Sequence, residues 1–275
     1  MVVKAGVSSD KSSGDVALSR EIVHELLVRS HWQRLGLKEV YALLPHTRCG
    51  RRTLCCSLLP EVTLVETLAV IMQLAGMAAP MRVRLTRSLV RYFLVNAVEI
   101  SCCPFLEGRD CLIYGDRFFG CRAYGMWSRP HYEKLAARSR QAKEYNREQW
   151  QNLGVLLPRE VVEFQVPYCP HVEVVEGEIV PEDEMLLHAA ELIEALSQQL
   201  GPWHESFRTR YFADLSFLFT SLIFGFPEAV QMKFSLVRDV VATGNRTRIA
   251  EILEEVPDLC GELREVATDN DRKGG

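Results

Sequence analysis

The residues of this sequence best suited to chemistry are its nine cysteines. They are Cys49, Cys55, Cys56, Cys102, Cys103, Cys111, Cys121, Cys169 and Cys260. An odd count does not allow every thiol to pair in a disulfide within the chain, and no apolar signal segment opens the sequence. We therefore expect a cytoplasmic protein whose thiols stay reduced and serve metal binding or catalysis.

Eight of the nine cysteines lie between residues 49 and 169, in sequence punctuated by glycine and proline. Glycine follows Cys49 and precedes Cys121, and proline follows both Cys103 and Cys169. Such neighbours keep the chain out of regular helix and free backbone N–H groups to donate to thiolates. A free cysteine can also be a small core hydrophobe. That interpretation fits Cys260, which stands in a helix-like stretch, better than it fits the other eight.

The candidate metal ligands are the thiols of this region and one nearby histidine. They are His46, Cys49, Cys55, Cys56, Cys103, Cys111, Cys121 and Cys169, with Cys102 as an additional candidate. Neighbouring side chains diverge in extended chain and are about 100° apart on a helix. Both members of an adjacent cysteine pair therefore do not readily point at one metal ion, and one of the two can bind a second centre or simply pack.

Four segments occur in a characteristic order: HTRCGRRTLCC (46–56), CPFLEGRDCLIY (103–114), RFFGCRAYG (117–125) and YCPHVEVVEG (168–177). This order resembles the YkgJ-like cysteine-cluster family of zinc- or iron-chelating proteins. The resemblance implies a metal centre, favours Cys103 over Cys102, and allows an enzymatic role, because some relatives are flagellin lysine methylases. The chain departs from the family pattern in having His46 in place of the first cysteine and Phe118 in place of a proline. His171 and Val172 likewise stand where Gly-Ile is more common.

The donor set favours iron–sulfur over zinc. Structural zinc sites usually take four ligands in closely spaced pairs, and no two cysteines here have Cys-x-x-Cys spacing. Eight thiols, or seven thiols with His46, would suit two 4Fe–4S clusters, and thiolate surroundings suit such clusters well. We expect one or two 4Fe–4S clusters, with zinc as the alternative.

Helical signals dominate the rest of the chain. Helices are predicted over 18–30, 63–76, 81–98, 128–153, 181–200, 204–224, 227–242 and 245–255. Among these signals, Thr63 and Glu66 have the spacing of a capping box. The fold class predicted is mainly α, with an irregular cysteine-rich metal-binding core packed by helices and a helical C-terminal region. We divide the chain into a flexible tail (1–15), a cysteine-cluster metal-binding domain (16–178) and a helical region packed on it (179–275).

The charge distribution of the chain and the absence of common enzyme motifs limit the classes of function that the sequence predicts. Residues 1–150 carry 22 Lys and Arg against 14 Asp and Glu, a net of +8, and residues 151–275 carry 10 against 22, a net of −12. We expect these halves to attract each other, although a basic half can also attract an acidic partner. Phosphate-loop, Gly-x-Ser-x-Gly and His-Glu-x-x-His motifs are absent, and no stretch is long and apolar enough to predict a membrane span.

Three functions remain open on these observations. The first is an iron–sulfur protein that serves electron transfer or assists another enzyme, with a protein partner and no sign of nucleic-acid binding. The second is a binding module stapled by zinc. The third is a metal-dependent protein-modifying enzyme such as a lysine methylase.

Overall fold

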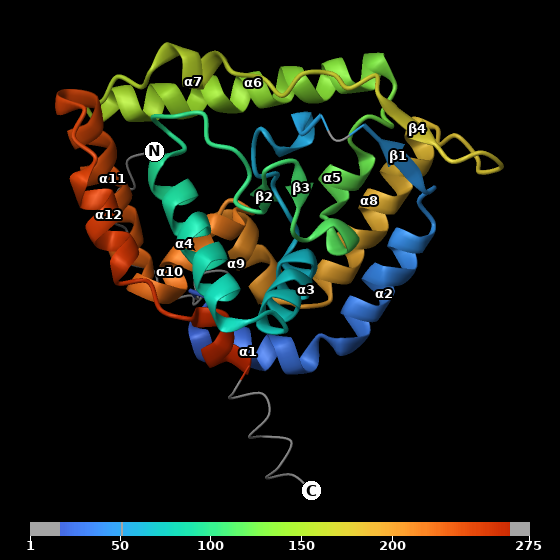
Figure 1. Ribbon diagram of the computed structural model, residues 1–275, viewed down its shortest axis with the longest axis horizontal. Coiled ribbons are helices and arrows are strands. Elements are labelled where there is room, and N and C mark those ends of the chain that lie inside the picture. The colour runs from blue at the N-terminus through green and yellow to red at the C-terminus, as the bar shows by residue number, and fades with distance from the viewer. Residues whose placement is uncertain (1–16, 51, 265–275) are drawn as a thin grey trace, which may run out of the picture.

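The computed structural model describes residues 17–50 and 52–264. The tail predicted over 1–15 lies outside these residues. The chain is mainly helical, as the sequence predicts (Figure 1). The helices of the first half are α1 (Arg20–Arg29), α2 (His31–Ala42), α3 (Leu64–Ala75), α4 (Ala79–Val95), α5 (Phe119–Ala123) and α6 (Arg129–Asn152). Those of the second half are α7 (Arg159–Glu163), α8 (Asp183–Gln198), α9 (Pro202–Arg210), α10 (Leu215–Phe224), α11 (Phe226–Thr243) and α12 (Thr247–Glu254).

Short extended and 3-10 segments lie between these helices. The strands are β1 (Thr47–Cys49), β2 (Leu106–Glu107), β3 (Asp110–Cys111) and β4 (Val172–Val174), and the 3-10 helices are η1 (Leu54–Cys56) and η2 (Tyr114–Asp116). The strands form two antiparallel pairs, β1 with β4 and β2 with β3. Most of the candidate cysteines therefore sit in short irregular elements, as the glycine and proline punctuation predicts.

Local sequence signals explain where several helices begin. The Ser19 hydroxyl accepts from the Ile22 N–H at the start of α1, and Ser128 caps α6 in the same way. The predicted capping box at α3 is present: Thr63 accepts from the Glu66 N–H, and the Glu66 side chain accepts from the Thr63 N–H. These caps satisfy N–H groups that a helix leaves without partners in its first turn.

The helix predicted over 204–224 is interrupted. Phe212 and Ala213 both have φ of +54°, and Asp214 then caps α10 by accepting from the N–H groups of Ser216 and Phe217. The break separates α9 from α10, of which Leu215 to Leu222 are buried. No single helix of the described chain is long and apolar enough to cross a membrane. The pair α10 and α11 meets that length and composition together, but it is bent by 111°.

The predicted N-terminal domain and C-terminal region share one hydrophobic core. Helix α8 packs on α2, and α10, α11 and α12 pack on α4. Ion pairs also join the basic and acidic halves, with Arg20 2.6 Å from Glu262 and Arg82 2.5 Å from Asp258. Because burial of apolar surface is the main stabilising term in folding, these regions behave as one packed body.

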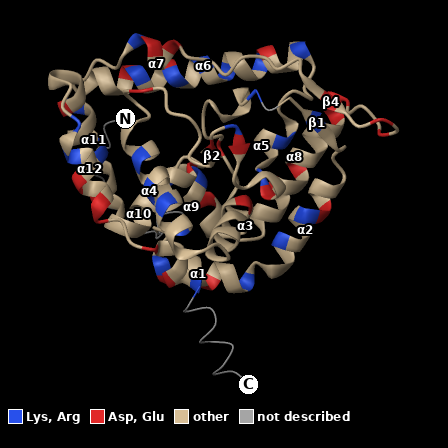
Figure 2. Cartoon of the chain, viewed as in Figure 1, with Lys and Arg blue, Asp and Glu red and all other residues tan. Residues whose placement is uncertain are grey.

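Helix α6 lies across one side of the molecule. The β2–β3 pair and α5 lie inside the ring of helices, whereas the β1–β4 pair lies at its edge (Figure 1). No residue of α6 is buried, and acidic and basic residues are mixed along this helix (Figure 2). Trp150 stacks on Phe234 of α11 at 5.8 Å, and Lys143 Nζ donates to the Phe164 carbonyl at 2.6 Å. The helix is therefore held mainly at its ends and along the segment that contains α7.

Candidate functional site

The β1–β4 ladder joins two cysteine segments that are more than one hundred residues apart in sequence. Cys49 lies opposite Val172, and Thr47 lies opposite Val174. This pairing brings Cys169 and His171, which precede β4, to the end of β1 that carries Cys49. The Gly125 backbone sits against this ladder with φ of +83°, where a Cβ would lie 2.5 Å from a Val172 methyl group.

A second set of contacts gathers the central cysteines. The Cys103 N–H donates to the Cys56 carbonyl at 2.8 Å, which fixes the loop before β2 to η1. The β2–β3 hairpin then turns through Gly108, whose φ is +60°, and places Leu106 opposite Cys111. Cys56, Cys103 and Cys111 are thus held close together by backbone hydrogen bonds.

Helix α5 supplies the next cysteine, and a buried carboxylate positions it. Glu66 is 4% exposed, and its Oε1 accepts from the Phe119 N–H at 2.6 Å and from the Tyr41 hydroxyl at 2.7 Å. The Arg122 guanidinium lies over the Tyr41 ring at 4.2 Å. Together these contacts fix the short helix that carries Cys121 to α2 and α3.

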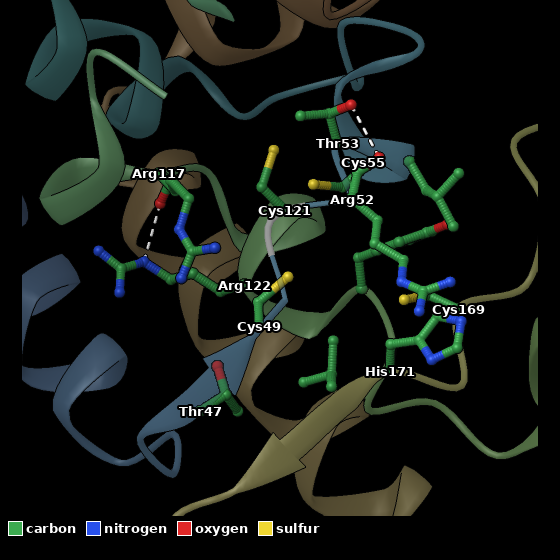
Figure 3. A pocket seen from close by; sticks show the side chains of 13 residues that line it. Thr47, Cys49, Arg52, Thr53, Cys55, Arg117, Cys121, Arg122, Cys169 and His171 are labelled. Atoms are coloured by element: carbon green, nitrogen blue, oxygen red, sulfur yellow. Dashed lines mark hydrogen bonds between the residues drawn. The ribbon is translucent and has the colours of Figure 1, made fainter. Parts of the chain in front are cut away.

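These elements surround two adjoining pockets. The larger pocket, of about 250 Å³, is lined by six cysteines: Cys49, Cys55, Cys56, Cys103, Cys111 and Cys121. The smaller pocket, of about 20 Å³, is lined by Cys49, Cys55, Cys121, Cys169 and His171 (Figure 3). Seven of the nine cysteines therefore line one continuous site, although they come from four separate segments of the chain.

Two of the sequence candidates lie outside the site. The His46 side chain is 84% exposed, and its Nδ1 lies 2.6 Å from Glu178 Oε1, so the structure does not bring it to the pockets. Cys102 is exposed and lines neither pocket. Cys260 is fully buried in the core at the C-terminal end, as its sequence setting indicates.

The structure adds residues that the sequence did not single out as part of the site. His171 lines the smaller pocket, and Arg117 lines both pockets. In Figure 3, Arg117 lies on one side of the thiols, and Arg52 and His171 lie on the other. The signal for His171 was its position two residues after Cys169, but His171 was not among the predicted metal ligands.

Burial and neighbouring thiols keep most of these cysteines protonated. Burial raises the pKa of Cys103 to about 12 and also raises the pKa values of Cys111 and Cys121. Backbone N–H groups act in the opposite direction: that of Phe105 donates to Cys103, and that of Ile113 donates to Cys111. Donation from the second residue after a cysteine to its sulfur is the kind of contact that stabilises a metal-bound thiolate.

The two adjacent cysteines, Cys55 and Cys56, have pKa values that are shifted in opposite directions. The sulfur atoms of Cys55 and Cys56 are 3.7 Å apart. Donation from Cys56, with the nearby Arg117 cation as a smaller contribution, lowers the pKa of Cys55 to about 7, and the same hydrogen bond raises the pKa of Cys56. The Cys55 thiol therefore ionises closer to neutral pH than an ordinary cysteine.

The pKa of Tyr124 reflects the thiols that lie near the smaller pocket. Burial raises the pKa of its hydroxyl to a value well above the usual range, and the nearby thiols of Cys169, Cys55 and Cys49 contribute to that increase. Cys121, in contrast, interacts electrostatically with Cys103 and Cys111 as well as with Cys55. Cys55 also interacts with Cys103 and Cys111, so the thiols of the site form one connected group.

Within the described residues, no three His, Cys, Asp or Glu side chains are arranged so that they could hold a metal ion. The donor chemistry is nevertheless of the kind that binds metals, because six thiols from three segments line the larger pocket and N–H groups donate to two of them. Cysteine has a single side-chain torsion, so a thiol that lines a pocket can turn toward its centre by one rotamer change. The site therefore offers thiols and open space, whereas the side chains as they stand are not placed around a metal ion.

Comparison with known proteins adds no relative: no protein-family model, curated protein or solved structure matches the chain.

Proposed function

We propose that this chain is a cysteine-cluster metalloprotein that binds an iron–sulfur centre in the larger pocket and serves in electron transfer or as an accessory to another enzyme. The observation that carries this proposal is the gathering of six thiols from three chain segments around a pocket of about 250 Å³. Such a volume far exceeds the roughly 10–15 Å³ that a single water needs. Thiolate donors spaced around a larger volume suit a multi-atom cluster better than one ion.

The chain's own residues would hold the centre through four of the six thiols that line the larger pocket. These are Cys56, Cys103, Cys111 and Cys121. The N–H groups of Phe105 and Ile113 would stabilise the negative charge on their sulfur partners, and Phe105 and Phe118 would exclude water from one wall. When bound, an iron–sulfur cluster supplies one-electron chemistry whose potential depends on such hydrogen bonds and on solvent access.

The positively charged side chains around the site favour an acidic protein partner. Four arginines line the two pockets, Arg52, Arg109, Arg117 and Arg122, against a single carboxylate, Asp110. Positive charge around a thiolate centre offsets the charge of the ligands and favours approach of an acidic protein surface. The protein partner expected from the sequence stays a prediction, and this charge balance supports an acidic one.

The four cysteine segments that support the resemblance to the YkgJ-like family are the segments that line the site. We therefore include membership of that family in the proposal. The order of the four segments and their position around the two adjoining pockets support this membership together.

The test is purification without oxygen, followed by analysis of iron, zinc and acid-labile sulfide per chain. Iron with a matching amount of sulfide and a broad visible absorption would support the proposal, and Cys103→Ser should remove both. Cys102→Ser is the matched control, because Cys102 is exposed and lines neither pocket. Zinc without iron or sulfide in the wild-type protein would overturn the proposal in favour of a zinc-stapled binding module.

A further inference from the structure

Two thiols of the site face each other although they belong to adjacent residues. The sulfur atoms of Cys55 and Cys56 are 3.7 Å apart. A disulfide bond is about 2.0 Å long, and a cysteine side chain turns about a single torsion. The two sulfurs therefore start close to the separation at which they bond, and side-chain rotation can close the rest of the distance.

The backbone of this pair is fixed on both sides. Both cysteines lie in η1, and Thr53, which precedes this 3-10 helix, has φ of +57°. A β-branched residue rarely adopts that left-handed conformation, and strain of this kind concentrates at functional sites. The Cys56 N–H donates to the Thr53 carbonyl at 2.9 Å, and the Cys56 carbonyl accepts from the Cys103 N–H at 2.8 Å. The short turn thus presents the two thiols together.

The pair also has access to a small molecule. Cys55 and Cys56 are half-buried, and both line the larger pocket, of about 250 Å³. Arg117 lines the same pocket and interacts electrostatically with Cys55. Its guanidinium lies over the Tyr114 ring at 3.8 Å, and its Nε donates to the Tyr114 carbonyl at 3.2 Å, so the cation is held in place. A pocket with a fixed cation beside thiols suits a small anionic molecule.

The second adjacent cysteine pair of the chain shows that adjacency alone does not produce this arrangement. Cys102 is exposed and lines neither pocket, whereas Cys103 is buried. Neighbouring side chains in extended chain point to opposite sides. The 3-10 turn of η1 is therefore what brings the sulfurs of the first pair together.

We infer that Cys55 and Cys56 form a dithiol that exchanges with the disulfide of a small thiol carrying carboxylates. In the first step the Cys55 sulfur loses its proton and attacks one sulfur of the small disulfide, which forms a mixed disulfide and releases the first small thiol with that proton. In the second step the Cys56 sulfur attacks the Cys55 sulfur, and the second small thiol leaves with the Cys56 proton. Two electrons pass from the protein to the small disulfide, and the reverse reaction restores the dithiol.

The bond between the two cysteines suits reversible exchange. Consecutive Cα atoms are about 3.8 Å apart, whereas disulfides usually join Cα atoms about 4.4–6.8 Å apart. Strained disulfides are the more readily reduced ones. The inference goes beyond the proposed function, because the exchange needs no metal. It also bears on that function, since Cys56 in a disulfide is lost as a ligand for the proposed centre.

The experiment maps the disulfide in the full wild-type chain. Iron and sulfide are measured on the reduced protein as purified without oxygen. A metal chelator and oxidised glutathione are then added, and free thiols are blocked with iodoacetamide under denaturing conditions. Trypsin releases residues 53–82, a peptide whose only cysteines are Cys55 and Cys56. We expect this peptide to carry no alkyl group and to accept two after reduction.

The chain contains its own matched control. The tryptic peptide 92–109 has Cys102 and Cys103 as its only cysteines and should form no internal disulfide. The same reaction in guanidinium measures chance pairing in the unfolded chain. The folded chain should form the Cys55–Cys56 disulfide roughly tenfold faster, because the pocket holds a cation beside the pair.

Variants test the order of the steps and the class of substrate. Cys56→Ser should stop at the mixed disulfide, with one glutathione on peptide 53–82, and Cys55→Ser should form that adduct more slowly. Arg117→Gln should slow the reaction with oxidised glutathione but not with cystamine, a disulfide that carries positive charges. Equal slowing with both disulfides would overturn the anionic class of substrate.

The failures of this inference and of the proposed function are distinguishable. Two alkyl groups on peptide 53–82 at every glutathione ratio, or equal rates in the folded and unfolded chain, would overturn the inference. Iron and sulfide in the same preparation would leave the proposed function standing. Rapid formation of the Cys55–Cys56 disulfide in protein that was purified without iron would support the inference and overturn the proposed function.

Discussion

Glu66 Oε1 accepts a hydrogen bond from the Phe119 N–H at 2.6 Å, across 53 residues of chain. The same carboxylate closes the capping box of α3 and accepts from the Tyr41 hydroxyl. One buried side chain therefore starts a core helix and also fixes the first turn of α5, which carries Cys121. The structural consequence is that the candidate site depends on a residue that does not face it.

Replacing Glu66 should lower both stability and metal content. Glu66→Ala removes a helix cap and leaves the Tyr41 hydroxyl and the Phe119 N–H without partners, so we expect a loss of about 2–4 kcal/mol in the free energy of unfolding. Chemical denaturation measures this loss, and metal analysis of the same sample reports on the site. Glu133→Ala on the exposed face of α6 should change stability little. Wild-type stability in Glu66→Ala would contradict the role assigned to this contact.

Ser197 forms a buried network that resembles a catalytic triad but serves structure. Its hydroxyl accepts from the Leu64 N–H at 3.1 Å, and the His204 imidazole lies 2.9 Å from it and 3.3 Å from Glu194. Ser197 is fully buried and lines neither cysteine pocket. Ser197→Ala should therefore destabilise the protein by about 1–3 kcal/mol without changing its metal content. A change in metal content at unchanged stability would contradict this interpretation.

Gly125 is required where the chain passes the β1–β4 ladder. Alanine at φ of +83° is strained, and its Cβ would lie 2.5 Å from a Val172 methyl group. We expect Gly125→Ala to cost about 2–4 kcal/mol, measured by thermal or urea unfolding. Gly154→Ala is the matched control: its φ is +79°, but nothing lies within 4 Å of the added carbon. At Gly154 only the backbone strain lowers the free energy of unfolding. Equal losses of stability at Gly125 and Gly154 would therefore show that the contact with Val172 contributes nothing.

Cys55 should be the most reactive thiol of the metal-free protein near neutral pH. Its pKa is lowered to about 7, so its thiolate fraction increases as the pH rises through that value, whereas an ordinary cysteine ionises near about 8.5. Alkylation by iodoacetamide, followed by mass spectrometry across pH 6–9, measures this profile. Cys56→Ala removes the hydrogen bond from Cys56 and should shift the midpoint upward. A Cys55 profile with its midpoint at 8.5 or above in the unsubstituted protein would contradict the geometry of the pair.

Metal binding and folding should be coupled. Cys103→Ser, Cys111→Ser and Cys121→Ser should each lower metal content and the thermal midpoint together, because the centre joins segments distant in sequence. Cys102→Ser should change neither. Cys260→Ser should keep wild-type metal content but lose stability, since it places a hydroxyl in a position that is 0% exposed. Full metal content in the first three variants would exclude them as ligands.

The sequence determined the helical class, most helix starts and the cysteine segments. The apolar positions of α3 and α8 repeat at helical spacing, and caps such as Thr63 act within one turn, so local sequence is sufficient to predict them. Glycine and proline likewise limit the backbone locally, which explains why the segments around Cys103 and Cys169 were expected to be irregular.

Only the tertiary structure decided which donors meet. His46 has ligand-like spacing from Cys49, yet it points to the surface and pairs with Glu178, whereas His171 reaches the smaller pocket. The register of β1 against β4 sets this difference, and that register depends on contacts between segments more than one hundred residues apart. The carboxylate of Glu66 is a second example, because its sequence signal described a helix cap and gave no sign of its bond to α5. Spacing along the chain limits which residues can bind together locally, but long-range packing selects the ones that do.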